Sequence, residues 1–439
     1  MISLACNGFK SAGICFEHGP TVTESPSALH VRQYTPRTMS SDVTRADFDT
    51  YMMPNYAPAP MVMSRGEGSK VWDQDGLEYI DFAGGIAVNA LGHANPDLVD
   101  ALTDQARRIW HLSNAYANEP AIRLARSLVS ATFADKVFFS NSGGEANEAA
   151  LKLARRYASD HHGPEKDDII AFRMGFHGRT FFTVSVGGQT KYSEGFGPKP
   201  GAITHVPFND IDAFGDAMSD RVCAVMVEPI QGEGGLVAAE PAFLQRLRAL
   251  CDAHEALLIF DEVQSGMGRT GSLYAYMDYD VVPDILTTAK ALGGGFPIAA
   301  TLTTEQIAAS FVVGAHGSTY GGNPLATAVA LRALEIINDE RFLDRVKEKA
   351  EHAFVRLRAM AATTGVFSEI RGKGLWIGCE IADGSPLGSG DIAIAALEHR
   401  LLVLKAGPNV VRLAPALNIP DGDLSDGLDR LEAAVKSLT

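Results

Sequence analysis

The sequence predicts an α/β fold with a large domain built on a mostly parallel sheet and a smaller α+β domain. Three short apolar runs, residues 169–172, 223–227 and 257–260, alternate with longer segments of helical period. Runs that are this short and apolar throughout are typical of strands buried on both faces of a parallel sheet. Helical and strand patterns mix again after residue 340, which indicates the second, smaller domain.

The composition is that of an ordinary globular protein. The 439 residues are 46% hydrophobic and 21% charged, and the net charge is −15. Such an acidic chain argues against nucleic acid as the main partner, because phosphate binding needs basic patches. No apolar run reaches the length of a membrane span and no signal-peptide pattern opens the chain, so we expect a soluble, cytoplasmic protein without a membrane partner. The five cysteines are scattered without a C-x-x-C pair and imply neither disulfides nor a metal site.

The N-terminal stretch differs in composition from the rest of the chain. It mixes Ser, Thr, Pro and Gly without any period, so we expect a disordered extension, with Met39 as a plausible start of the folded chain. From residue 70, two short segments around a Gln74-Asp75-Gly76 turn predict a β-hairpin. We expect four parts: a disordered extension (1–45), an N-terminal segment contributing to the small domain (46–95), a large cofactor-binding domain (96–330) and a C-terminal small domain (331–439).

A strand pattern at 136–140 leads through two glycines into a well-specified helix. Gly143 and Gly144 precede alanines and leucines that recur on one helical face from residue 146 to 154. The free backbone N–H groups of such a helix end, together with its positive dipole, suit a phosphate group. For this motif taken alone, we favour an ordinary strand-to-helix turn over a phosphate site.

The apolar run at 257–260 ends in Asp261 and Glu262. An acid at the end of a buried strand requires a cationic partner. The next apolar segment leads directly into Lys290, which precedes three glycines. A lysine and an acid at neighbouring strand ends suit pyridoxal phosphate, because the amine bonds to its aldehyde while the acid pairs with its pyridinium nitrogen. A buried structural ion pair is the alternative.

Further polar groups follow the other predicted strands. Phe176 and Arg179 leave the strand at 169–172, and such a pair can cover a flat ring and grip a carboxylate. We favour a hydrogen bond within the turn for His177 over a role as general base. An acidic, glycine-rich loop at 228–235 follows the strand at 223–227, and Arg412 lies on an otherwise apolar strand.

Taken in order, these motifs resemble those of class III, fold type I, pyridoxal-phosphate aminotransferases, and most closely the acetylornithine/succinylornithine aminotransferases. The resemblance covers residues 39–439. It lies in S-G-G-E-A-N-E (142–148), F-H-G-R-T (176–180), E-P-I-Q-G-E-G-G (228–235), F-D-E-V-Q (260–264) with G-M-G-R-T-G (266–271), A-K-A-L-G-G-G (289–295) and the loop 317–324.

The resemblance implies a role for each matching residue. Lys290 and Asp261 are the expected catalytic groups, the first bonded to the cofactor and the second paired with its ring nitrogen. Family members often carry Ala or Thr at the position of Gly144, and the glycine here should mainly loosen the turn. Further cofactor contacts are expected from Phe176 and Val263 on the ring faces, Gln264 near the phenolic oxygen, Glu262, the backbone of Gly143 and Gly144 at the phosphate, and Thr319 of a second subunit.

The implied activity transfers the terminal amino group of N-acetylornithine or N-succinylornithine to 2-oxoglutarate in a homodimer with shared active sites. Arg179 is the expected grip for the substrate carboxylate, Ser318 lies close to the substrate, and Glu233 with Arg412 forms a switchable second site. The nearest alternative is a 4-aminobutyrate or ornithine aminotransferase. A cofactor-sensing regulator is a third hypothesis, but it would need a DNA-binding segment ahead of the fold, and the N-terminal tail offers none. The hypothesis of a dinucleotide-dependent dehydrogenase is supported only by the motif G-x-G-x-x-G at 266–271.

Overall fold

The computed structural model describes residues 43–439, so the expected start at Met39 and nearly all of the expected N-terminal extension lie outside the described residues. The chain divides into two compact units, residues 1–55 and 56–439. The described part of the first contains helix α1 (Arg45–Tyr51), which begins with a capping box between Thr44 and Asp47. The domain boundaries at 95/96 and 330/331 both lie within the second unit and stay predictions.

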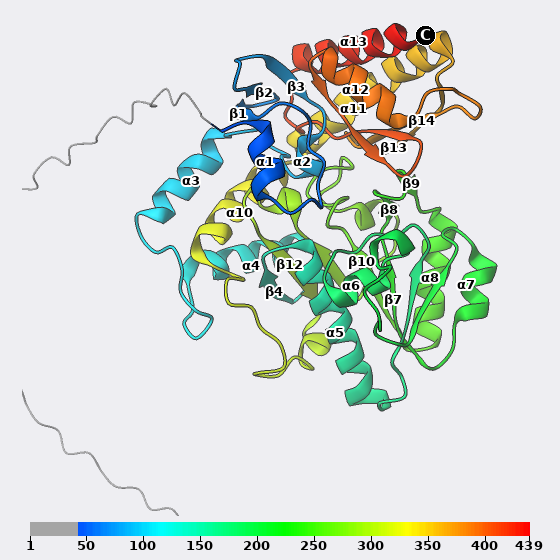
Figure 1. Cartoon of the computed structure of the whole chain (residues 1–439). Helices are drawn as coiled ribbons and strands as arrows, with labels where there is room; N and C mark the ends of the chain where they lie inside the picture. Colours follow the sequence, from blue (N-terminus) through cyan, green and yellow to red (C-terminus); the bar gives the residue numbers. More distant parts are fainter. Residues whose placement is uncertain (1–42) are drawn as a thin grey trace, which may run out of the picture. The chain divides into compact units, whose positions relative to one another are not determined.

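The second unit is organised around a seven-stranded sheet in the order β4-β12-β11-β10-β7-β5-β6 (Figure 1). Four neighbouring pairs are parallel, whereas β12 is antiparallel to both β11 and β4. The predicted mostly parallel sheet is confirmed. Its strands are β4 (Lys136–Ser140), β5 (Asp168–Phe172), β6 (Ile203–Val206), β7 (Val222–Val227), β10 (Leu257–Asp261), β11 (Ile285–Thr288) and β12 (Ala299–Thr303).

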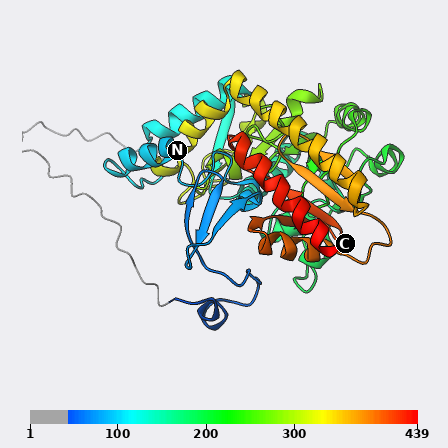
Figure 2. The ribbon, with the colours of Figure 1, turned by 90° about the horizontal axis from the view of Figure 1, so that it is seen from above.

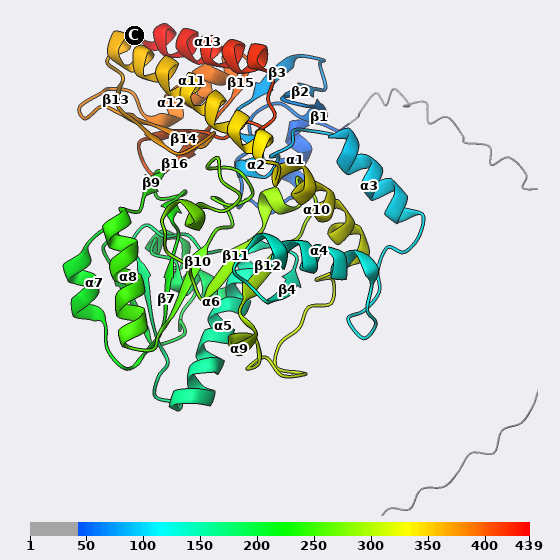
Figure 3. The same ribbon diagram turned by 180° about the vertical axis from the view of Figure 1, so that it is seen from behind.

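Strand β10 shows why these short runs are apolar at every position. Leu257 and Ile259 belong to one core cluster, together with residues of helix α5 (Gly143–His162). Leu258 and Phe260 belong to another, together with residues of helix α8 (Pro241–Ala253). Because successive side chains point to opposite faces, a strand between two helical layers must be apolar throughout, as Figure 3 lets the reader follow. The strand therefore delivers Asp261 to the edge of the sheet from a rigid position.

Two smaller sheets complete the second unit. In the first, the hairpin predicted near residue 70 is confirmed, and β3 also pairs in parallel with β15, which lies more than 300 residues later (Figure 2). In the second, β14 lies between β13 and β17. The first sheet contains β1 (Met63–Glu67), β2 (Lys70–Asp73), β3 (Glu78–Asp81) and β15 (Leu401–Leu402), and the second β13 (Phe367–Gly372), β14 (Ile377–Ile381), β16 (Leu404–Ala406) and β17 (Val410–Leu413).

Three long C-terminal helices accompany these sheets, with α13 packed against both α11 and α12 (Figure 2). Elsewhere α10 packs against α3 and α4. An asparagine caps the N-terminus of each: Asn323 for α10, Asn95 for α3 and Asn118 for α4. Among residues 43–439, every helix is too short or too polar to cross a membrane. The bounds are α3 (Pro96–Ala106), α4 (Glu119–Ala131), α10 (Pro324–Ile337), α11 (Glu340–Thr364), α12 (Ser389–Glu398) and α13 (Asp421–Leu438), with shorter helices α2 (Gly84–Ala87), α6 (Phe181–Val186), α7 (Ile211–Ala217) and α9 (Glu305–Ala308) and a ribbon of β8 (Ile230–Gln231) and β9 (Val237–Ala238).

Two glycines of α13 provide a test of how closely this helix packs. A Cβ added at Gly427 would lie 2.2 Å from Cζ of Phe82, whereas one added at Gly422 meets nothing within 4 Å. An alanine usually stabilises a helix by about 1 kcal/mol relative to glycine. We expect Gly427→Ala to lower Tm nonetheless, because the clash costs about 1–3 kcal/mol. The matched control Gly422→Ala should leave Tm unchanged or slightly raised, and a higher Tm for Gly427→Ala in differential scanning fluorimetry would contradict the close packing.

Candidate active site

A cavity of about 640 Å³ lies where the central strands end. Segments that follow β4, β5, β7, β10 and β11 line it, and it contains most of the sequence-predicted groups. A second cavity of about 720 Å³, lined by α11, β13 and the loop before Asp278, contains none of them. The chemistry is therefore to be sought in the first cavity.

Lys290 enters this cavity directly after β11. The residue is half-buried, and its backbone adopts a left-handed conformation with φ of 46°, which is rare for a residue with a side chain. Burial lowers the pKa of the Lys290 amine to about 8, with the charges of Glu233, Asp261 and Glu228 opposing this shift. A substantial fraction of the amine is therefore neutral near pH 8, as a nucleophile or proton acceptor has to be.

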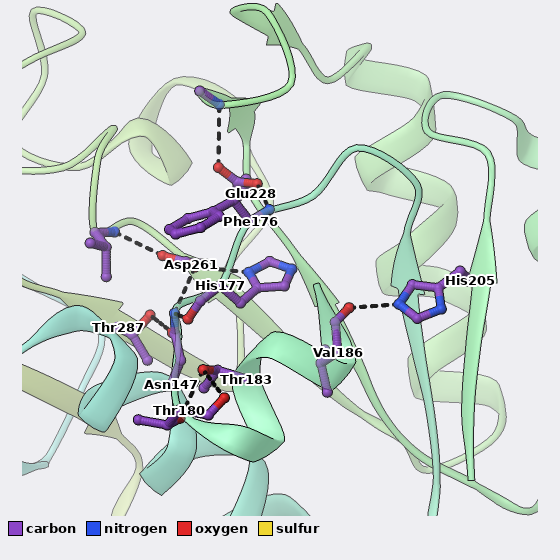
Figure 4. Close-up of polar contacts among 12 residues, drawn as sticks. Asn147, Phe176, His177, Thr180, Thr183, Val186, His205, Glu228, Asp261 and Thr287 are labelled. Carbon is purple, nitrogen blue, oxygen red and sulfur yellow. Dashed lines mark hydrogen bonds and ion pairs between the residues drawn. The ribbon is translucent and has the colours of Figure 1, made fainter. Parts of the chain in front are cut away.

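The carboxylate of Asp261 lies at the end of β10 and is only 5% exposed. Its Oδ2 accepts a hydrogen bond from Nδ2 of Asn147 at 2.8 Å and contacts Nδ1 of His177 at 2.8 Å (Figure 4). From residues 43–439, its Oδ1 accepts one hydrogen bond, from the backbone N–H of Val263 at 3.0 Å. Oδ1 therefore keeps a lone pair for a proton-bearing nitrogen within the cavity.

His177 and Asn147 are supporting residues of this carboxylate. We had expected a hydrogen bond within the turn for His177. The structure instead places its Nδ1 in contact with Asp261. Burial lowers the pKa of His177, but the bond to Asp261 and the charge of Glu228 outweigh that effect and raise it overall. Asn147, which the sequence did not single out, also accepts from Oγ1 of Thr287 at 2.6 Å and donates to the carbonyl oxygen of His177 at 2.8 Å.

The first turn of α5 forms another wall of the cavity. Oγ of Ser142 caps the helix by accepting from the backbone N–H of Glu145 at 3.3 Å, and both Gly143 and Gly144 line the cavity. A Cβ added at Gly143 would lie 2.7 Å from Cγ1 of Val263, whereas one at Gly144 would meet its nearest neighbour at 3.6 Å. This difference explains why larger residues can replace Gly144 in the family that the sequence resembles.

Phe176 and Val263 lie on the cavity lining, and a buried acid holds the first of them. Oε1 of Glu228 accepts from the backbone N–H of Phe176 at 2.8 Å, and Oε2 accepts from that of Gly232 at 3.2 Å (Figure 4). Burial raises the pKa of Glu228 to about 7, although the neighbouring His177 opposes this shift. We had assigned no role to Glu228, which comes directly after β7, much as Asp261 is the last residue of β10.

The predicted substrate groups occupy two places. Arg179 lines the cavity and is exposed, with its guanidinium 4.0 Å from the ring centroid of Tyr192. Arg412 is only 2% exposed, and its Nη1 donates to Oε1 of Glu233 and, at 3.1 Å, to Oε1 of Gln264. The structure therefore brings Glu233 and Arg412 into contact, as we had expected.

Five predicted residues do not line the cavity: Glu233 and Arg412, described above, and Glu262, Ser318 and Thr319. The prediction for Glu262 needs correction: this residue is fully buried, and its carboxylate accepts from the backbone N–H groups of Ala275 and Tyr276 and from Oγ of Ser265, so it anchors a loop. Oγ of Ser318 accepts from Nδ2 of Asn141 at 3.2 Å, next to the lining. Thr319 is exposed and outside the lining.

The residues present fit pyridoxal phosphate. A partly neutral lysine amine, a buried carboxylate with a spare lone pair and an uncovered helix N-terminus face the same cavity. The side chains of Phe176 and Val263 in the lining are apolar, which suits the faces of a flat ring. Fold and site together define an enzyme built around a reactive lysine.

The chain belongs to the class III aminotransferase family, because residues 51–435 match the family model described as Aminotransferase class-III. The succinylornithine transaminase/acetylornithine aminotransferase of Pseudomonas aeruginosa is 61% identical over 398 residues, which are 91% of this chain and 98% of that protein. The acetylornithine aminotransferase of Shewanella oneidensis is 59% identical over 402 residues, covering 91% and 99%.

Solved structures agree with this assignment. The N-acetylornithine aminotransferase from Stenotrophomonas maltophilia is 42% identical with a TM-score of 0.79, covering 90% of this chain and 98% of that one. The ornithine aminotransferase from Toxoplasma gondii is 34% identical with a TM-score of 0.86, covering 90% and 94%. The resemblance noted in the sequence is confirmed, and the chain is an aminotransferase of class III.

The two glycines of the α5 turn allow a matched test of the cavity wall. We expect Gly143→Ala to push Val263 into the cavity and to weaken pyridoxal phosphate binding about tenfold or more, because overpacking of about 1–3 kcal/mol falls on the bound state. Gly144→Ala should change the Kd by less than about twofold, since the added methyl group finds room. Titration of the apoprotein, followed by visible absorption, measures both constants. Equal constants for the two variants would contradict this description of the wall.

Proposed function

We propose that this chain is a pyridoxal-phosphate-dependent aminotransferase that moves the terminal amino group of N-acetylornithine or N-succinylornithine to 2-oxoglutarate, giving the semialdehyde and L-glutamate. The observation that carries the proposal is the convergence of Lys290 and Asp261 on the cavity that the first turn of α5 also lines. The names of the relatives at 61% and 59% identity support the acylornithine substrates.

The cofactor would be held by groups around the cavity. Gly143 and Gly144 would offer backbone donors for the phosphate, Phe176 and Val263 would cover the two ring faces, and Gln264 would lie near the phenolic oxygen; all five residues line the cavity. Thr319 of a second copy of the chain would reach the phosphate. Bound pyridoxal phosphate withdraws electrons from the amine-bearing carbon of the substrate, which makes loss of a proton from that carbon feasible.

Proton handling falls to two residues of this chain. The Nζ atom of Lys290 takes the proton from the substrate carbon and returns it on the other side of the reaction, and a pKa near 8 suits both directions. The carboxylate of Asp261 would keep a proton on the ring nitrogen of the cofactor, with Oδ1 as the available acceptor. Asn147 and His177 keep this carboxylate oriented through Oδ2.

Two substrates of different shape share the site. Arg179 grips a carboxylate that the substrates have in common, which agrees with its exposure at the cavity. Arg412 binds a further carboxylate only when Glu233 releases it. In the conformation described here Glu233 occupies Arg412, so this conformation corresponds to the half-reaction in which the second carboxylate is absent.

The enzyme would act as a homodimer with shared sites. The loop that contains Thr319 and the segment after α3 expose large apolar side chains, including Trp110 and Tyr116 at 66% and Tyr320 at 62%. Such side chains on a water-exposed surface support a protein interface. Within each copy, residues 46–95 and 331–439 would form the small domain around the large domain of 96–330.

An ornithine or 4-aminobutyrate aminotransferase is the second candidate. The TM-score of 0.86 with the ornithine aminotransferase from Toxoplasma gondii favours it, whereas the lower identity of 34% does not. The two candidates share every residue role given above and differ only in the amine donor.

A panel of amine donors with 2-oxoglutarate tests the proposal. We expect kcat/KM for N-acetylornithine and N-succinylornithine to exceed that for ornithine and 4-aminobutyrate at least about tenfold, which corresponds to about 1.4 kcal/mol of preferential transition-state binding. Formation of L-glutamate in a coupled assay measures each rate. Lys290→Ala serves as the control and should lose at least about 1,000-fold in rate, because the proton-transferring amine is gone. Faster transfer from 4-aminobutyrate would overturn the substrate assignment, and full activity of Lys290→Ala would overturn the mechanism.

Glu233→Gln tests the switch at Arg412. The neutral amide holds the guanidinium less firmly than a carboxylate does, so Arg412 should be available in both half-reactions. We expect the preference for ω-amino donors over the α-amino donor L-glutamate to fall about tenfold, while the absorption of bound cofactor stays the same. Steady-state kinetics with both donors measure the ratio. An unchanged ratio would remove the switch from the proposed mechanism.

A further inference from the structure

Arg269 is a fully buried arginine, at 0% exposure, and no acid among residues 43–439 forms an ion pair with it. Its Nη1 donates to the carbonyl oxygens of Leu375 at 3.0 Å and Pro415 at 2.6 Å. Its Nε and Nη2 have no partner within the described part of the chain. Burial alone lowers the pKa of the guanidinium to about 9, and no neighbouring charge opposes the shift. Burying such a cation costs several kcal/mol. A contribution to stability alone therefore does not account for this side chain.

The loop that presents Arg269 is closely packed at its glycines. A Cβ added at Gly266 would lie 2.7 Å from the ring of Tyr274, and one at Gly268 would lie 2.8 Å from Ile337. From the opposite direction, a Cβ at Gly374 would lie 2.4 Å from the carbonyl oxygen of Arg269. The glycines of G-x-G-x-x-G thus permit close packing here, and a short 3₁₀ helix (Ala275–Asp278) follows in place of the α-helix that dinucleotide binding needs.

The two carbonyl groups that Arg269 binds lie at the same end of a strand pair. In the antiparallel pair of β14 and β17, Ile377 faces Leu413 and Gly378 faces Arg412. Extending this register by two residues places Leu375 opposite Pro415. Proline has no N–H, so the ladder cannot close there with a backbone hydrogen bond from Pro415. Nη1 of Arg269 bridges the two carbonyl oxygens in its place.

Arg412 is therefore fixed twice by one loop of the large sheet. Gln264, just after β10, accepts from its guanidinium at 3.1 Å, and Arg269, five residues later, ties down the end of its strand. The same loop begins at Asp261, the carboxylate of the proposed cofactor site. The position of Arg412 relative to that carboxylate thus depends on the two bonds of Arg269.

We propose that Arg269 is a positioning residue that sets where Arg412 stands relative to the cavity, and with it the preference for substrates bearing a second carboxylate. This inference rests on the proposed function, in which Arg412 binds that carboxylate. Arg269 does not line the cavity and acts through the ends of β14 and β17.

The test compares two acceptors that share the distal carboxylate and differ only in the second carboxylate, next to the reacting carbon: 2-oxoglutarate and 4-oxobutanoate, using the cofactor-loaded full chain. Arg269→Met removes both bonds, and Arg269→Lys keeps a charge without the guanidinium fork. We expect the preference for 2-oxoglutarate to fall about tenfold or more through its KM, with kcat for 4-oxobutanoate and the cofactor absorption nearly unchanged. Arg155→Met is the matched control, because Arg155 also binds backbone carbonyl groups, those of Asp167 and Gly201, but away from Arg412.

Arg412→Met separates failure of the inference from failure of the proposed function. If Arg412→Met lowers the preference and the Arg269 variants do not, the inference is overturned and the proposed function stands. An unchanged preference in Arg412→Met as well would overturn both. Equal losses with the two acceptors, or a disturbed cofactor spectrum, would reduce Arg269 to a structural role and overturn the inference. If Arg269→Met does not fold, the Arg269→Lys ratio decides by the same criteria.

Discussion

The carboxylate of Asp261 imposes the constraint on which the rest of the site depends. It is almost fully buried, and His177 is its only ion-pair partner among residues 43–439. A buried charge of this kind is tolerable only when several donors are aimed at it. Asn147 from α5, His177 from the loop after β5 and the backbone after β10 supply those donors. Three elements are thereby locked around one point at the edge of the sheet.

A second layer of buried acids extends this arrangement. Glu228 joins the loop of Phe176 to the loop that leads to Glu233, and Glu262 holds the segment at Ala275 and Tyr276. Each accepts backbone N–H groups, so each fixes main chain directly. Burial raises the pKa of both to about 7, which shows how far they are from water. The walls of the cavity are consequently rigid, whereas Arg179 at its edge remains exposed.

Sequence reasoning predicted the parts of this structure that depend on local pattern. The apolar runs at β5, β7, β10 and β11 follow from burial on both faces, and the placement of Lys290 and Asp261 follows from them. Strand β12 went unpredicted, because Ala-Ala-Thr-Leu-Thr has neither a long apolar run nor a clear alternation.

The contacts that sequence reasoning missed join residues far apart in the chain. Asn147 and Asp261 are 114 residues apart, and His177 and Asp261 are 84 apart, so no local spacing reports them. A polar residue in the buried phase of α5 was the available signal for Asn147. The adjacency of Glu262 to Asp261 misled the assignment, because successive residues leaving a strand point in opposite directions.

One feature of α5 bears on which molecules the cavity can accept. The glycines of its first turn face one end of the site, and Asn147, one turn further along, holds the carboxylate at the other. The helix rises about 1.5 Å per residue, so the number of residues between the glycines and Asn147 sets the separation of the two ends. Inserting a single residue between them would swing Asn147 about 100° around the axis and away from Asp261. The distance from the first-turn glycines to the residue that orients Asp261 is thus fixed by the backbone of a helix and does not depend on side-chain conformation.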